Sequence, residues 1–554
     1  MALDPNIVAA RSCGMREAGL WTDEIVDTHF DHAVRSFPDK IALVGYRADS
    51  AVPRKFTYRE LGDMVDRAAG ALRYMGVGRG DIVSIQLPNW WEFVVAALAC
   101  VRVGAAANPL VAILREREVS YMVGFCEAKV LIVPKVFRGF DHEAMAKTIQ
   151  RAVSTLRHVV VVDGDGSDNF DRAMLAGERR EGFPGVAASA LKPDDLLVLM
   201  YTSGTTGEPK GVMHTSNTLN SSAMQFGKGL QLGQDDILHA VSPVGHMTGY
   251  AIFVLLPILL NATIVLQDVW NAERGLSIMQ AEGVTFSAGA TPFLADICDA
   301  AIAGPRRPSQ LRRFYCSGAP IPPALVQRAF NDLKVSISSV WGMTELIAGT
   351  MTELERAVDK AWTTDGRAIK GVEVKVTSDD NVELPRGQIG RLMVRCASMF
   401  CGYLKRPELY TVSPEGWFDS GDLARMDDEG YIRITGRTKE LLIRGGENVP
   451  VIEIENLIAE HSAVANVAII GFPDARLGER ACAFVVPKPG KTIDLEELKR
   501  YLDECKVSKT YWPERIELID DLPRTASGKV QRFVLKEVAK AFSEDQRPDR
   551  TARA

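Results

Sequence analysis

The chain has 554 residues, of which 46% are hydrophobic and 25% are charged, and its net charge is −6 at pH 7. These proportions are those of an ordinary globular protein and exclude a disordered chain or a disulfide scaffold. The acidic balance gives no basic footprint for nucleic acid. Since a single hydrophobic core stops growing near about 250–300 residues, two or three domains are expected.

The cysteines and the apolar runs indicate in which compartment the protein is expected. The nine cysteines are scattered, with no CxxC pair and no Cys/His cluster at zinc spacing, which fits a reducing, cytoplasmic compartment. The N-terminus carries Asp4 and lacks the long apolar run of a signal peptide. The most apolar stretch, 251–266, is interrupted by Pro257 and Asn261 and is shorter than the about 20 residues that span a bilayer. We therefore expect no membrane span.

Short apolar runs alternate with helical patterns along the first part of the chain. A helix is predicted at 61–75, because apolar residues from Leu61 to Leu72 recur on one face and Gly76 can end it. The stretch 251–266 is expected to form a buried helix and strand. Strands are predicted at 82–85, 130–133, 159–162 and 196–201. This alternation predicts an α/β fold built from βαβ-type units.

A different pattern begins near Gly436. Strands are expected at 465–470, 481–486 and 515–518, around an amphipathic helix that contains Leu498. We therefore predict a large N-terminal domain, residues 1–436, and a small α+β C-terminal domain, residues 437–554. The polar tail from Ser543 to Ala554 is expected to be frayed.

A loop rich in glycine and hydroxyl side chains follows the predicted strand at 196–201. It reads Thr202-Ser203-Gly204-Thr205-Thr206-Gly207-Glu208-Pro209-Lys210-Gly211. Glycines let backbone N–H groups approach an anion, hydroxyls donate hydrogen bonds, and a lysine adds a mobile charge. The loop suits phosphate, but composition alone leaves a flexible surface turn open, and the GxxxxGK[ST] pattern does not fit.

With the preceding Tyr201, this loop closely resembles the signature of the adenylate-forming superfamily, which includes acyl-CoA synthetases, luciferases and peptide-synthetase adenylation domains. The resemblance extends from Pro88-Asn89 to the C-terminus. The chain looks most like medium- and short-chain fatty acyl-CoA ligases and cyclohexanecarboxylate-CoA ligases. The resemblance implies a large adenylate-forming domain and a small, mobile C-terminal domain. It also implies that ATP, Mg²⁺ and coenzyme A take part in making an acyl adenylate and then a thioester.

The resemblance assigns roles to residues of the large domain. Thr202 to Gly207 and Lys210 would hold the phosphates. Trp341-Gly342-Met343-Thr344-Glu345 is similar to a segment whose aromatic ring lies by adenine, whose threonine meets phosphate and whose glutamate binds Mg²⁺. Gly318-Ala319-Pro320 would line adenine and the acyl pocket, and Asp422 would accept hydrogen bonds from the ribose hydroxyls.

Further residues are assigned to the second half of the reaction and to the acid. Arg437 would lie near the ribose or phosphates, and Lys439 would be the pivot between the domains. Gly445 and Gly446 could allow the pantetheine arm of coenzyme A close to the backbone. Lys529 would be the catalytic lysine that reaches the carboxylate and the α-phosphate, and His246 would present its ring near the substrate carboxylate.

The identity of the acid stays open at this stage. Met247 and Thr248 stand where amino-acid-activating relatives carry an aspartate, which disfavours an amino acid. An apolar pocket around Met247, Gly249 and Ala290 would suit a medium-chain, alicyclic or aryl acid. The partners are then a small carboxylic acid and coenzyme A, without nucleic acid, and a homodimer is a possible assembly.

Three alternatives share parts of this pattern. An acyl-AMP ligase that loads a carrier protein would have the same adenylation motifs and differ in the thiol acceptor. A catalytically dead nucleotide-binding homologue would usually have lost a chemical residue. That alternative is weakened by the presence of Lys210, Glu345, Asp422, Arg437 and Lys529. Nothing in the sequence identifies the oxygen-handling step of a luciferase-like oxygenase.

Overall fold

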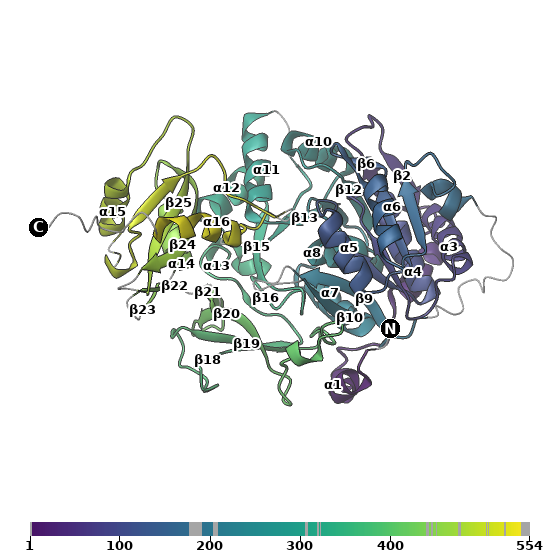
Figure 1. Cartoon of the computed structure of the whole chain (residues 1–554), viewed down its shortest axis with the longest axis horizontal. Coiled ribbons are helices and arrows are strands. Elements are labelled where there is room, and N and C mark those ends of the chain that lie inside the picture. The colour runs from purple at the N-terminus through teal and green to yellow at the C-terminus, as the bar shows by residue number, and fades with distance from the viewer. Residues whose placement is uncertain are drawn as a thin grey trace, which may run out of the picture.

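Four sheets of four or more strands form the framework of the chain (Figure 1). The computed structural model describes residues 3–176, 191–202, 209–304, 308–317, 321, 323–438, 442–444, 447–449, 451–474, 478–505, 507, 509–525 and 528–543. The C-terminal strands lie at one end of the molecule, and the N-terminal helices α3 (Tyr58–Tyr74) and α4 (Trp91–Val103) lie toward the other. No described helix has the length and hydropathy needed to cross a bilayer.

The largest sheet has nine strands and is parallel through its centre. Its strands in spatial order are β17 (Arg367–Ala368), β16 (Thr350–Met351), β15 (Ser336–Trp341), β14 (Arg313–Cys316), β13 (Phe286–Gly289), β11 (Ile237–Ala240), β12 (Thr263–Gln267), β1 (Ile41–Tyr46) and β2 (Arg54–Thr57). Strands β2, β16 and β17 are antiparallel additions at the two edges. The carboxyl ends of the parallel strands therefore meet at one edge, where α/β proteins place their ligands.

The second sheet has six strands and ends in a hairpin that carries the glycine-rich loop. Its strands in spatial order are β10 (Lys210–Thr215), β9 (Leu196–Thr202), β4 (Ala106–Pro109), β3 (Ile82–Ile85), β5 (Val130–Pro134) and β8 (His158–Val162). All pair in parallel except β10, which returns antiparallel to β9. A separate two-stranded hairpin is made by β6 (Val136–Phe137) and β7 (Phe140–Asp141).

A layer of helices fills the space between these two sheets, because one hydrophobic core contains side chains of both sheets and of these helices. Every residue of α4 is buried, which explains its nearly uninterrupted apolar sequence. The core also includes a π-helical segment at Ala251–Leu255. The other helices of this layer are α2 (Val26–Ser36), α3, α7 (Ser216–Gly229), α8 (Met247–Tyr250) and α9 (Leu256–Leu260).

The outer faces of both sheets are covered by further helices. One core packs α10 (Ala272–Glu282), α11 (Thr291–Ala303) and α12 (Pro323–Leu333) on the nine-stranded sheet. Another packs α5 (Glu116–Phe125) and α6 (His142–Ala152) on the six-stranded sheet. The N-terminal domain is thus a stack of alternating helical and sheet layers, as the predicted βαβ pattern requires.

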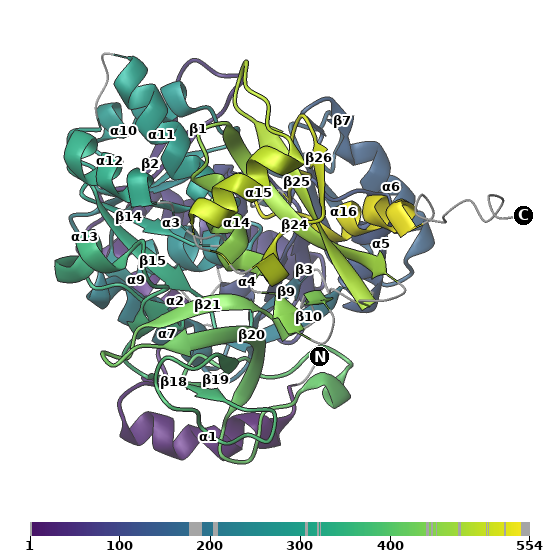
Figure 2. The same cartoon turned by 90° about the vertical axis from the view of Figure 1, so that its left-hand side faces the viewer.

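A four-stranded antiparallel sheet follows, which the sequence analysis did not predict. It consists of β18 (Val372–Thr377), β19 (Gly390–Cys396), β20 (Phe418–Met426) and β21 (Ile432–Arg437). Helix α1 (Pro5–Glu17) lies beside this sheet (Figure 2). Trp21, which follows α1, donates from its indole Nε1 to the Ala397 carbonyl at 2.9 Å. The two ends of the N-terminal domain are therefore joined here.

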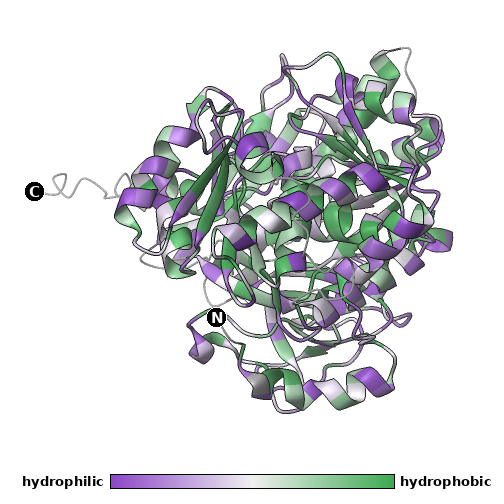
Figure 3. Ribbon diagram, turned by 90° about the vertical axis from the view of Figure 1, so that its right-hand side faces the viewer, coloured by the Kyte–Doolittle hydropathy of each residue, from purple (hydrophilic) through white to green (hydrophobic). Residues whose placement is uncertain are grey.

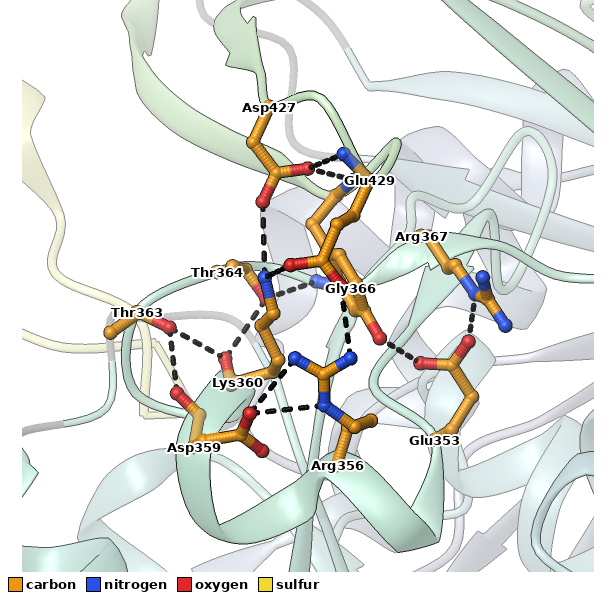
Figure 4. Close-up of polar contacts among 11 residues, drawn as sticks. Glu353, Arg356, Asp359, Lys360, Thr363, Thr364, Gly366, Arg367, Asp427 and Glu429 are labelled. Carbon is orange, nitrogen blue, oxygen red and sulfur yellow. Dashed lines mark hydrogen bonds and ion pairs between the residues drawn. The ribbon is translucent and has the colours of Figure 1, made fainter.

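An exposed polar network joins α13 (Ala357–Lys360) to the turn between β20 and β21 (Figure 4). Lys360 Nζ donates to Glu429 at 2.8 Å and to Asp427 at 3.2 Å, and Arg356 donates to Glu429 at 2.9 Å. Lys360 and Arg356 hold the pKa of the Glu429 carboxyl at about 2. Because exposed ion pairs contribute little to stability, this network adds little to the stability of the fold.

The C-terminal strands form a five-stranded sheet with mostly hydrophobic strands (Figure 3). The strands are β22 (Leu442–Arg444), β23 (Glu447–Val449), β24 (Val464–Asp474), β25 (Gly478–Pro487) and β26 (Arg515–Leu518). One face packs on α14 (Val451–Ala459) and α15 (Leu495–Glu504), and the other packs on α16 (Arg532–Lys540). This is the α+β unit that the sequence predicted.

The fold class is confirmed, and the predicted elements occur where the patterns indicated. The helix predicted at 61–75 is α3, and the predicted run at 251–266 forms helical turns followed by β12. The predicted domain boundary after Gly436 falls one residue before the end of β21. The division into two parts that move independently stays a prediction.

Candidate active site

The strands β9 and β10 position the two described ends of the glycine-rich loop. Thr202 and Lys210 are directly opposite each other in the antiparallel register of this hairpin. Both are half-buried, so Lys210 stands at the mouth of the loop. The predicted phosphate-binding residues between them, Ser203, Gly204, Thr205, Thr206 and Gly207, lie outside the described residues.

The segment that follows β15 makes a tight turn. A Cβ at Gly342 would lie 1.9 Å from the Ile347 carbonyl oxygen, so only glycine fits there. Ile347 itself has φ +71°, which is an outlier for a β-branched residue, and its N–H donates to the Met343 carbonyl at 2.7 Å. Strained backbone of this kind concentrates at functional sites. The turn closes on the end of β15, where the Gly349 N–H donates to the Trp341 carbonyl at 2.9 Å.

Glu345 is a buried carboxylate, 6% exposed, with one hydroxyl partner that the sequence analysis missed. The Tyr403 hydroxyl donates to Glu345 Oε1 at 2.8 Å. Burial raises the pKa of Glu345, while the Tyr403 hydroxyl acts in the opposite direction. The charges of Lys210 and Arg437 also lower it. The carboxylate therefore lies within the field of two cations from different sheets.

The backbone carbonyl of Thr344 is hydrogen-bonded to the buried His214. His214 Nε2 lies 2.8 Å from the Thr344 carbonyl oxygen, and His214 Nδ1 lies 3.1 Å from Thr218 Oγ1. Because a carbonyl only accepts, the ring carries its hydrogen on Nε2 and Nδ1 is the acceptor. No local pattern in the sequence indicates this contact, since His214 and Thr344 are 130 residues apart.

Acidification is expected to destabilise the fold through His214. Burial lowers the pKa of His214 from 6.5 to about 4, so the folded chain holds the neutral ring. The free energy of unfolding is therefore not reduced by His214 above pH 6.5. It falls as the pH drops from 6.5 toward 4, because the unfolded chain then binds a proton at His214 that the folded chain excludes. The whole effect is roughly 3 kcal/mol. Urea unfolding at pH 7 and pH 5 should show a smaller acid-induced loss for His214→Gln than for the wild type, and equal losses would contradict the assignment.

Asp422 joins two other predicted site residues. Its carboxylate accepts from the Trp341 indole Nε1 at 2.8 Å and from Arg437 Nε at 2.9 Å. Asp422 and Arg437 are register partners on β20 and β21, and both Asp422 and Trp341 are buried. The tryptophan therefore offers more than the stacking surface expected from the sequence, because its N–H fixes the carboxylate.

Lys529 reaches this region from the C-terminal unit. It lies in a tight hairpin in which the Thr525 N–H donates to the Lys529 carbonyl at 2.7 Å, with Gly528 at φ +83°. A Cβ on Gly528 would lie 3.6 Å from Ala290 Cβ, so this hairpin touches the large domain. Desolvation and the nearby Lys529 charge lower the pKa of His246 to about 4. His246 is thus a neutral ring close to Lys529.

His246 lies next to a short helix that packs closely against neighbouring backbone. His246 precedes α8, in which Met247 and Tyr250 are buried. A Cβ at Gly249 would lie 2.0 Å from the Pro243 carbonyl oxygen. The absence of a side chain at Gly249 therefore lets α8 pack against this backbone, and the expected pocket around Met247, Gly249 and Ala290 stays a prediction.

The structure brings the described candidates into two groups, whose members come from separate sheets and loops. Trp341, Asp422 and Arg437 form one cluster through hydrogen bonds to the Asp422 carboxylate. Glu345 belongs with this cluster because the charges of Arg437 and Lys210 both lower its pKa. Lys529 lies near His246. The candidates Gly318, Ala319, Pro320, Lys439, Gly445 and Gly446 lie outside the described residues. Among the described residues no group of three His, Cys, Asp or Glu side chains could hold a metal by itself.

Comparisons with known proteins cover nearly the whole chain. The model of the AMP-binding enzyme family matches residues 30–404, and that of the AMP-binding enzyme C-terminal domain matches residues 453–529. The medium-chain fatty-acid–CoA ligase of Escherichia coli K12 is 34% identical over 541 residues, which are 97% of this chain and 94% of that protein.

Solved structures agree in fold. That of the anthranilate CoA ligase AuaEII in complex with anthranoyl-AMP has a TM-score of 0.83 and 25% identity, and covers 94% of this chain and 98% of its own. ATP-bound MatB from Rhodopseudomonas palustris has a TM-score of 0.81 and 28% identity, and covers 93% of this chain and 99% of its own.

Proposed function

Because the chain belongs to the AMP-binding enzyme family, we propose that it is an ATP-dependent acyl-CoA ligase that works through an acyl adenylate. The observation that carries this proposal is the convergence of cations on two buried carboxylates. Lys210 and Arg437 act on Glu345, and Arg437 also pairs with Asp422. Lys529, from the C-terminal unit, lies near His246. A nucleotide triphosphate and a carboxylate are the anions that such a site would join.

The chemistry has two steps. The carboxylic acid is already ionised at neutral pH, so it needs positioning more than a base. Its oxygen attacks the α-phosphorus of ATP, the bond to pyrophosphate breaks, and acyl-AMP forms. Lys210, Arg437 and Lys529 would offset the repulsion between these anions. The thiolate of coenzyme A then attacks the acyl carbonyl, and the bond to AMP breaks.

We further propose that the C-terminal domain moves between these steps. Lys529 would withdraw from His246 after adenylation as the small domain rotates about Lys439, and Gly445 and Gly446 would approach the pantetheine arm. The contact between Gly528 and Ala290 supports the first of the two arrangements.

Glu345 is the residue that fits Mg²⁺. A buried carboxylate with a neutral hydroxyl partner suits a hard cation, and Mg²⁺ is usually held by one or two carboxylates together with substrate phosphates. When bound, the ion would supply charge neutralisation at the phosphates. Thr344, whose carbonyl is fixed by His214, would present its hydroxyl to the same phosphates.

Glu345→Gln is expected to raise the Mg²⁺ concentration needed for half-maximal pyrophosphate release by roughly tenfold, because the amide lacks the charge that a hard cation prefers. The measurement is a Mg²⁺ titration at fixed ATP. Glu373→Gln is the matched control, since Glu373 is an exposed glutamate paired with Arg395. An unchanged Mg²⁺ requirement in Glu345→Gln would remove Glu345 from the metal site.

For the acid, we propose a medium-chain, alicyclic or aryl carboxylate. The support is the uncharged Met247 and Thr248 beside His246, together with relatives named for a fatty acid and for anthranilate. Pyrophosphate release should be measured across cyclohexane, benzene and C4 to C12 carboxylic acids with coenzyme A present. Release with none of them would contradict the proposed function.

The thiol acceptor is proposed to be free coenzyme A. The rival is a holo carrier protein, which the same assay separates when the thioester product is identified with each acceptor. A product only with the carrier protein would favour the rival. A cytoplasmic location and a homodimer are the remaining proposals, and light scattering of the purified chain tests the second.

A further inference from the structure

The residues Met399–Leu404, here called the bridging segment, connect the strand of Lys210 to the turn of Glu345. On one side the Cys401 N–H donates to the Met213 carbonyl at 2.8 Å, and the Leu404 N–H donates to the Gly211 carbonyl at 2.8 Å. On the other side the Phe400 N–H donates to the Glu345 carbonyl at 2.8 Å. The segment is thus bonded through its backbone to both halves of the site.

The bridging segment is also hydrogen-bonded to the N-terminal helix α1. Arg11 on α1 donates to the Met399 carbonyl at 2.7 Å and to the Phe400 carbonyl at 3.3 Å. These carbonyls are 388 and 389 residues away in the sequence. Because charge-assisted hydrogen bonds are stronger than neutral ones, Arg11 restrains the segment against the site.

Tyr403 is the residue of this segment whose side chain enters the site. Its hydroxyl donates to Glu345 Oε1 at 2.8 Å, and Lys210 Nζ lies 5.1 Å from its ring centroid. That position is within the range of a cation–π contact. The ring is 6% exposed and packs against Phe400 at 4.7 Å between centroids, so its orientation is fixed. One side chain therefore touches both the carboxylate and the lysine.

We propose that Tyr403 is a positioning residue that sets Glu345 and Lys210 relative to each other for nucleotide binding and adenylation. The hydroxyl fixes the Glu345 carboxylate, and the ring face holds the Lys210 ammonium, while the bridging segment fixes the ring. This inference rests on the proposed function and adds a residue that acts through Glu345 without contacting the acid. A phenylalanine would keep the ring contact with Lys210 and remove the bond to Glu345.

The test is calorimetry of MgATP binding in the absence of acid, followed by pyrophosphate release with the best acid. Tyr403→Phe is expected to weaken MgATP binding roughly tenfold, as loss of a hydrogen bond to a charged group implies. The KM for the acid and thioester formation from supplied acyl-AMP should be unchanged. Tyr410→Phe is the matched control, because Tyr410 also packs on Phe400, at 5.1 Å, and its hydroxyl bonds no described residue.

A double-mutant cycle separates positioning from a general effect on the fold. If Tyr403 acts through Glu345, then Tyr403→Phe should have no further effect on MgATP binding in the Glu345→Gln background. Equal weakening in both backgrounds, or wild-type binding in Tyr403→Phe, would overturn the proposal. The proposed function fails separately, when the wild type releases pyrophosphate with no acid of the panel. A melting temperature for each variant shows that the compared chains are folded.

Discussion

Lys529→Ala is expected to reduce acid-dependent pyrophosphate exchange by roughly 10²–10³-fold, the effect of removing one preorganised group from a charged transition state. Thioester formation from supplied acyl-AMP should be largely unchanged, since the proposed motion takes the lysine out of the site before that step. The two half-reactions are measured separately, by isotope exchange and by product formation from acyl-AMP with coenzyme A.

A second measurement on Lys529→Ala, the pKa of His246, does not depend on turnover. The Lys529 charge is one of the two causes that lower the pKa of His246 to about 4, so its removal should raise that pKa, as followed by NMR titration. Lys540→Ala is the matched control, because Lys540 is an exposed lysine of the same unit paired with Glu537. Equal loss of both half-reactions would count against the domain motion.

Arg102→Met is expected to lower the free energy of unfolding by about 3–5 kcal/mol, the cost of leaving buried charges without a partner. Arg102 lies near the end of α4 and donates from Nε to Asp27 at 3.0 Å, with further ion pairs to Asp31 and Asp66. Burial already raises the pKa of Asp27 and of Asp31, and Arg102 opposes this. Without the guanidinium, both carboxylates would be strongly disfavoured in their charged form.

The pH dependence of this variant follows from the same shifts. Raised folded-state pKa values mean that the folded variant binds more protons than the unfolded chain, so its deficit should be larger at pH 7 than at pH 5. Urea unfolding at both values measures it. Arg59→Met is the control, since the Arg59 and Asp39 side chains are 59% and 84% exposed and should contribute at most about 1 kcal/mol. A deficit no larger than that of Arg59→Met would contradict the role assigned to Arg102.

Elements with a strong local period were predictable from the sequence, and the antiparallel sheet at 372–437 was not. Buried parallel strands such as β3 and β5 are apolar runs of four or five residues, and this short length favours a strand over a buried helix. Strand β18 alternates valine with charged residues, a signal that was available. Strand β20 alternates in burial only from Asp422 to Met426, and its sequence hides this because the buried Asp422 is polar and 419–421 are all half-buried.

The candidate site was predictable where a motif carried it and not where distant segments meet. The motif at 341–345 indicated Glu345, but its partner Tyr403 lies 58 residues further along and has no local mark of function. The same holds for Arg11, whose contacts with the bridging segment are made by tertiary packing alone. For Trp341 the motif indicated the aromatic ring but not its hydrogen bond, since the partner of the indole N–H depends on where β20 places Asp422.

The topology of the nine-stranded sheet also has a consequence for synthesis on the ribosome. Strands β1 and β2 emerge first, but the parallel neighbour of β1 is β12, with Leu43 opposite Ile264, 221 positions later. At about 5–20 residues per second, translation needs roughly 10–45 s to deliver that neighbour. During this interval β1, an apolar strand that is buried in the folded protein, has one edge without its neighbouring strand. Chaperones cover surfaces of this kind. The speed of translation, and not only the final sequence, therefore sets how long this protein is exposed to aggregation.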